Sequence, residues 1–197
     1  MEPRSDERLL AEFLAGDESA FPVLVERYAP GLYQFVARFV RDGATAEDIV
    51  QETFVQVHQS AGAFDETRRF RPWLFTIAAN KARDQIRAKG RKREVSLSGQ
   101  SGTSDHEDQA SYLDFFSDRG ASPSEIVEDE EQRRIVRAIV DGMPHHLREV
   151  LILGYYQRFP YKEIAEVLAI PLGTVKSRLH AAVKHFAAAY QAALGEQ

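Results

Sequence analysis

Residues 161–180, YKEIAEVLAIPLGTVKSRLH, have the pattern of two short helices joined by a tight turn. Apolar side chains at helical spacing mark one face of each helix: Ile164, Ala165 and Leu168 in the first, Val175 and Leu179 in the second. Ile170 and Pro171 interrupt the helical pattern between them. This arrangement predicts a helix-turn-helix, which binds duplex DNA by laying its second helix in the major groove.

The opposite face of the second helix supplies the side chains that would contact DNA. It carries Thr174, Lys176, Ser177, Arg178 and His180, with Lys184 one turn further on. An alternative role for Thr174 is to cap this helix. The alternative for the whole segment is an ordinary helical hairpin with a polar exposed face. Ala169 stands where such turns often carry glycine, so we expect a turn of slightly different geometry.

Charge is divided unevenly along the chain, whose formal net charge is −5. Residues 1–66 hold 5 basic and 13 acidic side chains, whereas residues 67–93 hold 10 basic and 1 acidic. Residues 94–131 hold 1 basic and 11 acidic, and residues 132–197 hold 9 basic and 5 acidic. Binding to nucleic acid depends on where the basic charge lies, not on the total. Both basic segments are therefore candidate nucleic-acid surfaces.

Several other classes of protein are disfavoured. The sequence contains no cysteine, which excludes disulfides and thiolate metal sites. The charged amino terminus leads into no long apolar run, so we expect neither a secretion signal nor a membrane span, and a cytoplasmic location. No nucleophile is paired with a base, and no metal-ligand spacing is present. We therefore expect no catalytic residue, no metal and no cofactor.

Helical periodicity dominates the chain and predicts an all-α fold of two small helical domains joined by a flexible acidic linker. We predict a first domain over residues 1–93, a linker over 94–122 and a second domain over 123–197. Apolar groups of helical spacing mark the first domain: Leu9–Leu14, Phe21–Tyr28 and Leu32–Phe39. A further helix is predicted from a cap at Thr45 to about Ala61. Pro72 opens another, which is predicted to reach Arg87 or a little beyond.

The second domain is predicted to begin with a helix whose first turn contains Pro123 and which ends at Gly142. A helix over residues 145–156 follows, and the helix-turn-helix comes next. The linker is rich in Ser, Gly, Asp and Gln and has no sustained period. A short apolar cluster interrupts it and could dock on another surface: Tyr112, Leu113, Phe115 and Phe116.

A second candidate nucleic-acid surface lies in the helix over residues 70–87. Leu74, Ile77 and Ala78 are expected to face inward. The exposed stripe is then Asn80, Lys81, Asp84 and Arg87. Basic groups interleaved with aromatic rings suit a single strand, whose phosphates need charge and whose bases need rings to stack on. For Trp73 and Phe75, a place in the hydrophobic core is an equally good interpretation.

An acidic and amide stripe precedes this helix. Asp48, Gln51, Glu52 and Val55 fall on one helical face. Such a surface would repel DNA, so a basic protein surface is the better partner. The alternative is a solvated helix face without a partner.

Taken together, these segments resemble the sigma factors of bacterial RNA polymerase, in the extracytoplasmic-function (ECF) group. Residues from about 18 to 93 are similar to sigma region 2, and residues from about 130 to 190 to region 4. The segment DIVQETF at 48–54 resembles the polymerase-binding helix, residues 70–87 the minus-10 helix, and GTVKSRL at 173–179 the minus-35 reading helix. Like that group, the chain has no counterpart of region 3.

The resemblance implies three sets of site residues. Contact with the β′ coiled coil of the polymerase is implied for Asp48, Gln51 and Glu52, with Phe54 beside them or only packing. Minus-10 contacts are implied for Phe70, Arg71, Trp73, Asn80, Lys81, Arg83, Asp84 and Arg87. Minus-35 contacts are implied for Thr174, Lys176, Ser177, Arg178, His180 and Lys184. The implied partners are core RNA polymerase, through its β′ coiled coil and β flap, promoter DNA, and an anti-sigma protein that clamps both domains.

The chain departs from the family pattern at four positions. Ala79 stands where an arginine is common, and His58 where a tryptophan is common. Ala181 and Ala182 follow His180, where the family usually continues with arginines. These departures predict a weaker grip on phosphates or an altered minus-35 preference.

Two other functions compete with a sigma factor. A regulator that binds duplex operators, with a sensory or dimerising amino-terminal domain, would explain the helix-turn-helix but would leave the basic aromatic helix unused. An enzyme acting on nucleic acid would need a catalytic carboxylate cluster on the basic face, which the sequence lacks.

Overall fold

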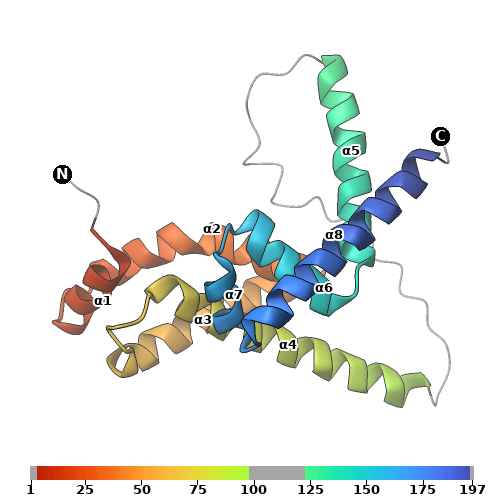
Figure 1. Ribbon diagram of the computed structural model, residues 1–197. Coiled ribbons are helices and arrows are strands. Elements are labelled where there is room, and N and C mark those ends of the chain that lie inside the picture. Colours follow the sequence, from red (N-terminus) through yellow and green to blue (C-terminus); the bar gives the residue numbers. More distant parts are fainter. Residues whose placement is uncertain (1–3, 98–122, 196–197) are drawn as a thin grey trace.

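The computed structural model describes residues 4–97 and 123–195. Within these ranges the chain forms helices and no strand, which confirms the all-α prediction (Figure 1). The first part contains α1 (Asp6–Leu14), α2 (Ala20–Val40), α3 (Gly43–Ser60), the short 3-10 helix η1 (Ala61–Ala63) and α4 (Phe70–Leu97). The second contains α5 (Pro123–Gly142), α6 (His145–Leu151), the π-helical turn η3 (Ile152–Tyr156), α7 (Tyr161–Leu168) and α8 (Leu172–Gly195).

Helices α1 to α4 pack around a core rich in aromatic rings. Phe35 and Phe39 of α2 stack with centroids 5.9 Å apart, and Phe75 of α4 tilts against Phe35 at 5.5 Å. All three are at most 1% exposed. Burial of rings of this size dominates the stability of a small helical bundle. This core fixes α3 and α4, which carry the candidate sites, against α2.

The boundaries of the first-domain helices differ from prediction in three respects. The two apolar groups of residues 21–28 and 32–39 belong to one continuous helix, α2, which contains Pro30. The cap of α3 is Asp42, not Thr45, because the Asp42 carboxylate accepts hydrogen bonds from both the backbone N–H and the hydroxyl of Thr45. Helix α4 continues to Leu97, beyond the predicted start of the linker at residue 94. The apolar cluster at 112–116 lies outside the described residues.

The second domain contains the predicted helix-turn-helix. Helices α7 and α8 are joined by a turn in which Ala169 adopts the left-handed conformation, with φ 51° and ψ 46°. The helix predicted over residues 145–156 is split into α6 and the π-helical turn η3. Arg158, also left-handed with φ 52°, then redirects the chain before Pro160 leads into α7.

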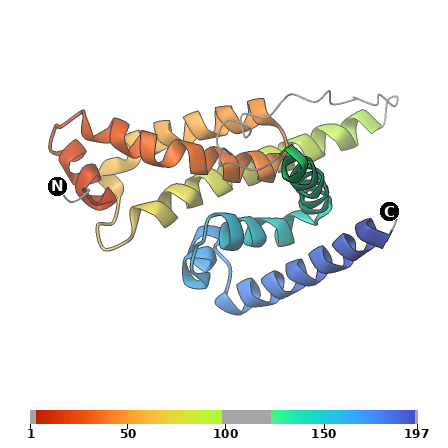
Figure 2. The same ribbon diagram turned by 90° about the horizontal axis from the view of Figure 1, so that it is seen from above.

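The two domains pack side by side. Figure 2 shows α6, η3 and α7 lying along the bundle of α2 to α4, and Figure 1 shows α5 and the far end of α8 projecting away from it. One cluster of buried side chains runs through both domains and includes Phe35 and Phe75 on one side and Leu153, Phe159 and Ile164 on the other. None of the helices in the described ranges is long and apolar enough to span a membrane.

Candidate protein and nucleic-acid interfaces

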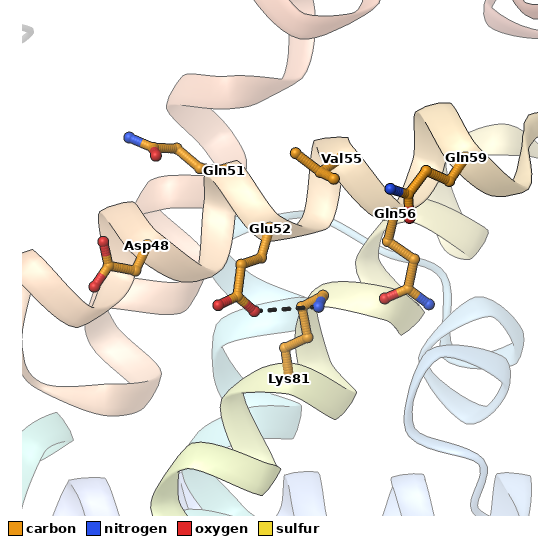
Figure 3. A pocket seen from close by; sticks show the side chains of 7 residues that line it. All are labelled: Asp48, Gln51, Glu52, Val55, Gln56, Gln59 and Lys81. Carbon is orange, nitrogen blue, oxygen red and sulfur yellow. Dashed lines mark hydrogen bonds and ion pairs between the residues drawn. The ribbon is translucent and has the colours of Figure 1, made fainter.

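Helix α3 presents a shallow hollow on the surface of the first domain. Its lining is Asp48, Gln51, Glu52, Val55, Gln56 and Gln59 of α3, together with Lys81 of α4 (Figure 3). Asp48, Gln51 and Glu52 are all exposed. Val55 is 55% exposed and gives the hollow an apolar element. The structure thus brings the predicted acidic stripe together on one accessible face.

An ion pair links this hollow to the neighbouring helix. The Nζ of Lys81 lies 3.2 Å from an oxygen of Glu52, as Figure 3 shows. Phe54, by contrast, points inward, where its ring meets Phe21 edge-on at 6.5 Å. Phe54 therefore supports α3 from within and does not reach a partner.

Helix α4 carries the predicted minus-10 side chains on an outer face. Of the predicted stripe, Asn80, Asp84 and Arg87 are exposed, whereas Lys81 is half-buried beside Glu52. Arg87 pairs with Asp84 at 2.6 Å on the same helix. Because both partners of this pair face solvent, it contributes little to stability and can be exchanged for a contact with nucleic acid.

The aromatic residues at the start of α4 belong mainly to the core. Phe70 is fully buried, so its ring is not accessible to DNA in this conformation. Its ring packs against Tyr28 and Trp73 at 5.7 and 5.9 Å. Phe75 is likewise buried. Trp73 is half-buried, with Phe64 at 4.9 Å, so it retains some accessible ring.

A third face of α4 is covered by the second domain. Arg71, Phe75, Ala79 and Arg83 recur every fourth residue and so lie along one side of the helix. Arg71 donates to the backbone carbonyl of Gln157, and its guanidinium lies 4.1 Å from the ring centre of Phe159. Arg83 donates to both Glu149 and the carbonyl of Leu168. Two of the predicted minus-10 arginines therefore lie in the contact between domains.

The side chains on the polar face of α8 are partly exposed and partly half-buried. Lys176, Ser177, His180 and Lys184 are exposed. Thr174 is half-buried and lies in the first turn of α8. Arg178 is half-buried and pairs within the second domain, where its guanidinium lies 3.0 Å from the carboxylate of Glu149 on α6. The outer ridge of Lys176, His180 and Lys184 is thus the accessible basic part of this helix.

Three of the four departures from the family pattern have a structural reason. Ala79 and Ala182 are fully buried, so neither position has room for an arginine without repacking. Ala181 is exposed and leaves a gap in the basic surface of α8. The ring of His58 lies between those of Phe13 and Phe21, at 4.9 and 5.2 Å.

The sequence analysis missed a set of buried polar residues at the domain contact. Arg148, Glu149 and Gln157 are each less than 10% exposed. Arg148 donates to the carbonyls of Phe39 and Asp141, and burial lowers the pKa of Arg148 to about 10. Gln157 donates to the carbonyl of Gly31 at 3.0 Å. No pattern of spacing distinguishes these side chains from a solvated helix face, because their partners lie far away in sequence.

Comparison with protein-family models identifies both domains. Residues 24–92 match the model described as Sigma-70 region 2. Residues 133–186 match the model described as Sigma-70, region 4. The first match contains α3 and α4 as far as residue 92, and the second contains the helix-turn-helix.

Curated relatives are similar along nearly the whole chain. The RNA polymerase sigma-H factor of Pseudomonas aeruginosa is 30% identical over 97% of this chain and 96% of its own length. The ECF RNA polymerase sigma factor SigW of Bacillus subtilis is 34% identical over 84% of this chain and 86% of its own.

Two solved structures share the fold over most of the chain. CnrH, solved in complex with the cytosolic domain of CnrY, aligns with a TM-score of 0.66 and 25% identity over 96% of this chain and 99% of that one. The sigma factor RpoE of Bartonella quintana, solved with the anti-sigma factor NepR, aligns with a TM-score of 0.65 and 23% identity. That alignment covers 87% of this chain and 96% of RpoE.

Proposed function

This chain belongs to the ECF sigma factors of bacterial RNA polymerase, and on that basis we propose which of its surfaces carries out each step of initiation. As a sigma factor, it binds core RNA polymerase and directs it to promoters. The proposal assigns one surface to the polymerase and two to DNA.

The hollow on α3 is the proposed polymerase-binding surface. The exposed carboxylates of Asp48 and Glu52 give it negative charge, and Val55 adds exposed apolar area at its centre. An acidic rim around an apolar contact suits a basic protein surface such as a coiled coil of the polymerase β′ subunit. Glu52 would exchange Lys81 for a basic partner on the polymerase; its own side chain is 65% exposed and so is open to such a partner.

The outer face of α4 is the proposed minus-10 surface. Asn80 can donate and accept hydrogen bonds with a base edge, and Arg87 can contact phosphate. The half-buried ring of Trp73 offers a stacking surface nearby on the same helix. Arg71 and Arg83 would join this surface once the second domain has moved away.

The outer ridge of α8 is the proposed minus-35 surface. Thr174, Lys176 and Ser177 lie in the first two turns of the second helix of the motif, the part that contacts base edges in the major groove. His180 and Lys184 follow one and two turns later, where the groove wall brings phosphates close. Lys184 is therefore assigned to phosphate, not to base reading.

Melting follows from differential binding and needs no covalent step. If α4 binds a separated strand and a flipped base better than the duplex, its binding energy shifts the equilibrium toward the open promoter. The chain acts in this scheme as a transcription initiation factor and contributes no catalytic group. The β flap of the polymerase is the proposed partner of the second domain.

We include an anti-sigma protein among the proposed partners. CnrH, similar over nearly its whole length, was solved with the cytosolic domain of a second protein bound. A partner that covers the hollow on α3 would exclude the polymerase from this chain. Such a partner, if membrane-anchored, would hold the sigma factor at the cytoplasmic face of the membrane.

The assignment of α3 to the polymerase rests on the exposed carboxylates of Asp48 and Glu52, and reversing their charge tests it. The double variant Asp48→Lys, Glu52→Lys should co-elute with sigma-free bacterial core RNA polymerase at least tenfold more weakly than the parent chain in size exclusion at moderate salt. Reversal of Glu26, an exposed carboxylate on α2 outside the hollow, should leave co-elution unchanged. Equal binding by both variants would remove the assignment of α3.

A further inference from the structure

Helix α1 carries none of the surfaces assigned above, yet two of its acidic side chains bind the rest of the first domain. Leu9 and Leu10 anchor the helix in the core, since both are at most 1% exposed. Asp6 and Glu7, in its first turn, are half-buried. Their hydrogen-bond partners lie on α2 and α4. Partly buried carboxylates need such partners to compensate for lost water, so α1 is held against these two helices at defined points.

Glu7 supplies an acceptor at the start of α4. Its carboxylate accepts a hydrogen bond at 3.0 Å from the backbone N–H of Phe70, the first residue of α4. N–H groups in the first turn of a helix have no acceptor within that helix. The side chain of Arg69, just before α4, has only donors, and Pro72 has no N–H to satisfy. The carboxylate also meets the positive end of the helix dipole, so a group from α1 takes the role that a local Ser or Asp has at other helices.

Asp6 supports Phe70 through a second route. Its carboxylate accepts hydrogen bonds from Arg27 and from the hydroxyl of Tyr28, both on α2. Burial and this carboxylate raise the pKa of Tyr28, so the hydroxyl stays protonated and remains a donor. The ring of Tyr28 packs against that of Phe70 with centroids 5.7 Å apart. Glu7 therefore fixes the backbone of Phe70, and Asp6 fixes its ring by way of Tyr28.

Phe70 in turn supports the half-buried ring of Trp73. The two ring centroids lie 5.9 Å apart, and Phe64 lies 4.9 Å from Trp73. The exposed Arg68 and Arg69 belong to the short loop between Phe64 and Phe70. An unstacked base needs a ring held in a fixed plane and a cation near its phosphate. The positions of both groups depend on where α4 begins.

We propose that Glu7 of α1 is a positioning residue for minus-10 recognition: its carboxylate fixes the first turn of α4 and, through Phe70, the ring of Trp73 on which an unstacked base lies. Glu7 acts through α4 and is not itself assigned a contact with DNA. This inference deepens the minus-10 assignment of α4 made above and rests on it.

The fluorescence of Trp73 reports on this site alone, because the chain contains one tryptophan. Glu7→Ala leaves the N–H of Phe70 without its acceptor, so acrylamide should quench Trp73 with about twice the efficiency found in the parent chain. Glu7→Gln keeps an acceptor oxygen at the same reach and should match the parent chain. Glu7→Asp keeps the charge but is one methylene shorter, so it should resemble Glu7→Ala.

A random-sequence single strand of about 12 bases tests the consequence for DNA binding. Stacking of a base on the indole should quench Trp73 in the parent chain. Glu7→Ala and Glu7→Asp should bind the strand about fivefold more weakly, the lower end of what stacking of one base contributes. Glu7→Gln should bind at least as tightly as the parent chain. Simple electrostatics gives the opposite order, since removal of a negative charge strengthens binding to a polyanion. Unchanged or tighter binding by Glu7→Ala would overturn the proposal.

Glu12→Ala is the matched control. Glu12 is a half-buried glutamate of the same helix, but its carboxylate pairs with Arg4 and Arg8 at 2.8 and 2.9 Å and not with α4. This variant should keep the acrylamide quenching of the parent chain and should not weaken binding of the strand. Equal losses in Glu12→Ala and Glu7→Ala would mean that both loosen α1 in general and would overturn the positioning role. If Glu7→Ala does not fold, equal quenching of Glu7→Asp and Glu7→Gln overturns the proposal instead.

The parent chain separates this inference from the assignment on which it rests. Quenching by the single strand that is the same in the parent chain and in Glu7→Ala would remove the positioning role and leave the minus-10 assignment intact. No quenching of the parent chain by the strand, with the expected order of acrylamide quenching among the variants, would remove the minus-10 assignment and leave the fixation of Trp73 by Glu7 intact.

Discussion

At the scale of single residues, Ala169 is one of three described non-glycine residues with a left-handed backbone, beside Arg41 and Arg158. It adopts φ 51° and ψ 46°, where an L side chain brings Cβ close to the following carbonyl. The sequence analysis expected a modified turn here because alanine replaces glycine. The structure shows that the turn keeps the left-handed geometry of glycine and that alanine accepts the strain.

Replacing Ala169 by glycine should therefore stabilise the second domain. Relief of about 1 kcal/mol of strain should exceed the entropic cost of glycine and raise the free energy of unfolding by about 0.5 kcal/mol. Ala187→Gly, in the exposed interior of α8, should instead lower the free energy of unfolding by about 1 kcal/mol. Urea titration followed by circular dichroism distinguishes the two signs.

Asp42 is the second residue whose role depends on local geometry. Its carboxylate accepts hydrogen bonds from Lys89, from the backbone N–H of Thr45 and from the Thr45 hydroxyl. The Lys89 ammonium and the Thr45 backbone bond lower the pKa of Asp42 to about 2. Asp and Thr are both favoured at a helix N-cap, so residue type alone does not distinguish Asp42 from the predicted cap Thr45. Only the structure shows that α3 begins at Gly43 and that Asp42 is its cap.

Asp42→Ala should lower the free energy of unfolding by about 1 kcal/mol at neutral pH. Because the folded pKa of Asp42 lies below its unfolded value, its contribution is present above about pH 4 and is lost as the pH falls toward 2. The variant should therefore lose less stability than the parent chain over that window. Asp84→Ala, which removes only an exposed ion pair, serves as the control in denaturation at several pH values.

At the scale of helices, periodicity predicts the elements whose one face is apolar and whose neighbours are short loops. Helix α7 and the start of α8 were predicted in this way. Three features escaped it: the continuity of α2 through Pro30, the length of α4 and the π-helical turn η3. Each is decided by packing. The backbone N–H of Gln157, for instance, donates to the carbonyl of Ile152, five residues back, which no residue preference specifies.

If the outer ridge of α8 binds phosphates, the affinity of the chain for duplex DNA should depend on salt concentration through its lysines. Lys176→Gln and Lys184→Gln should each reduce the slope of log K against log salt by about 0.9 for binding to duplex DNA, if each lysine neutralises one phosphate. Lys176→Gln should in addition relax sequence preference once a promoter is known, because it lies nearer the base edges. Arg8→Gln on α1, remote from α8 in the fold, should leave the slope unchanged.

At the scale of the whole molecule, the sequence predicted two domains but not their contact. The acidic stripe on α3 emerged as predicted, since it depends only on helical spacing. The predicted stripe on α4 emerged at Asn80, Asp84 and Arg87 but not at Lys81, which is half-buried beside Glu52. The places of Arg83 and Arg178 could not be predicted, because their shared partner Glu149 lies 66 residues from one and 29 from the other. Long-range pairing of this kind has no local signal.

A substitution of Phe159 would test whether the two domains unfold as one unit. It is buried, meets Phe75 edge-on at 5.0 Å and supports the Arg71 guanidinium. Phe159→Ala should lower the free energy of unfolding by about 3 kcal/mol. Because one buried cluster spans both domains, we expect a single calorimetric transition for the parent chain and two for this variant. Phe186→Ala, on the α8 face away from this contact, should destabilise the second domain without dividing the transition. A single transition in both variants would mean that other contacts suffice to couple the domains.

The shared carboxylate at Glu149 has an evolutionary consequence. Arg83 joins α4 of the first domain to Glu149 on α6, whereas Arg178 joins α8 to the same carboxylate within the second domain. A lineage that substitutes Arg178 alters the second domain alone, whereas one that substitutes Arg83 also loses a tie between the domains. The outer ridge of Lys176, His180 and Lys184 is exposed and offers selection a route to new targets that leaves the domain contact unchanged.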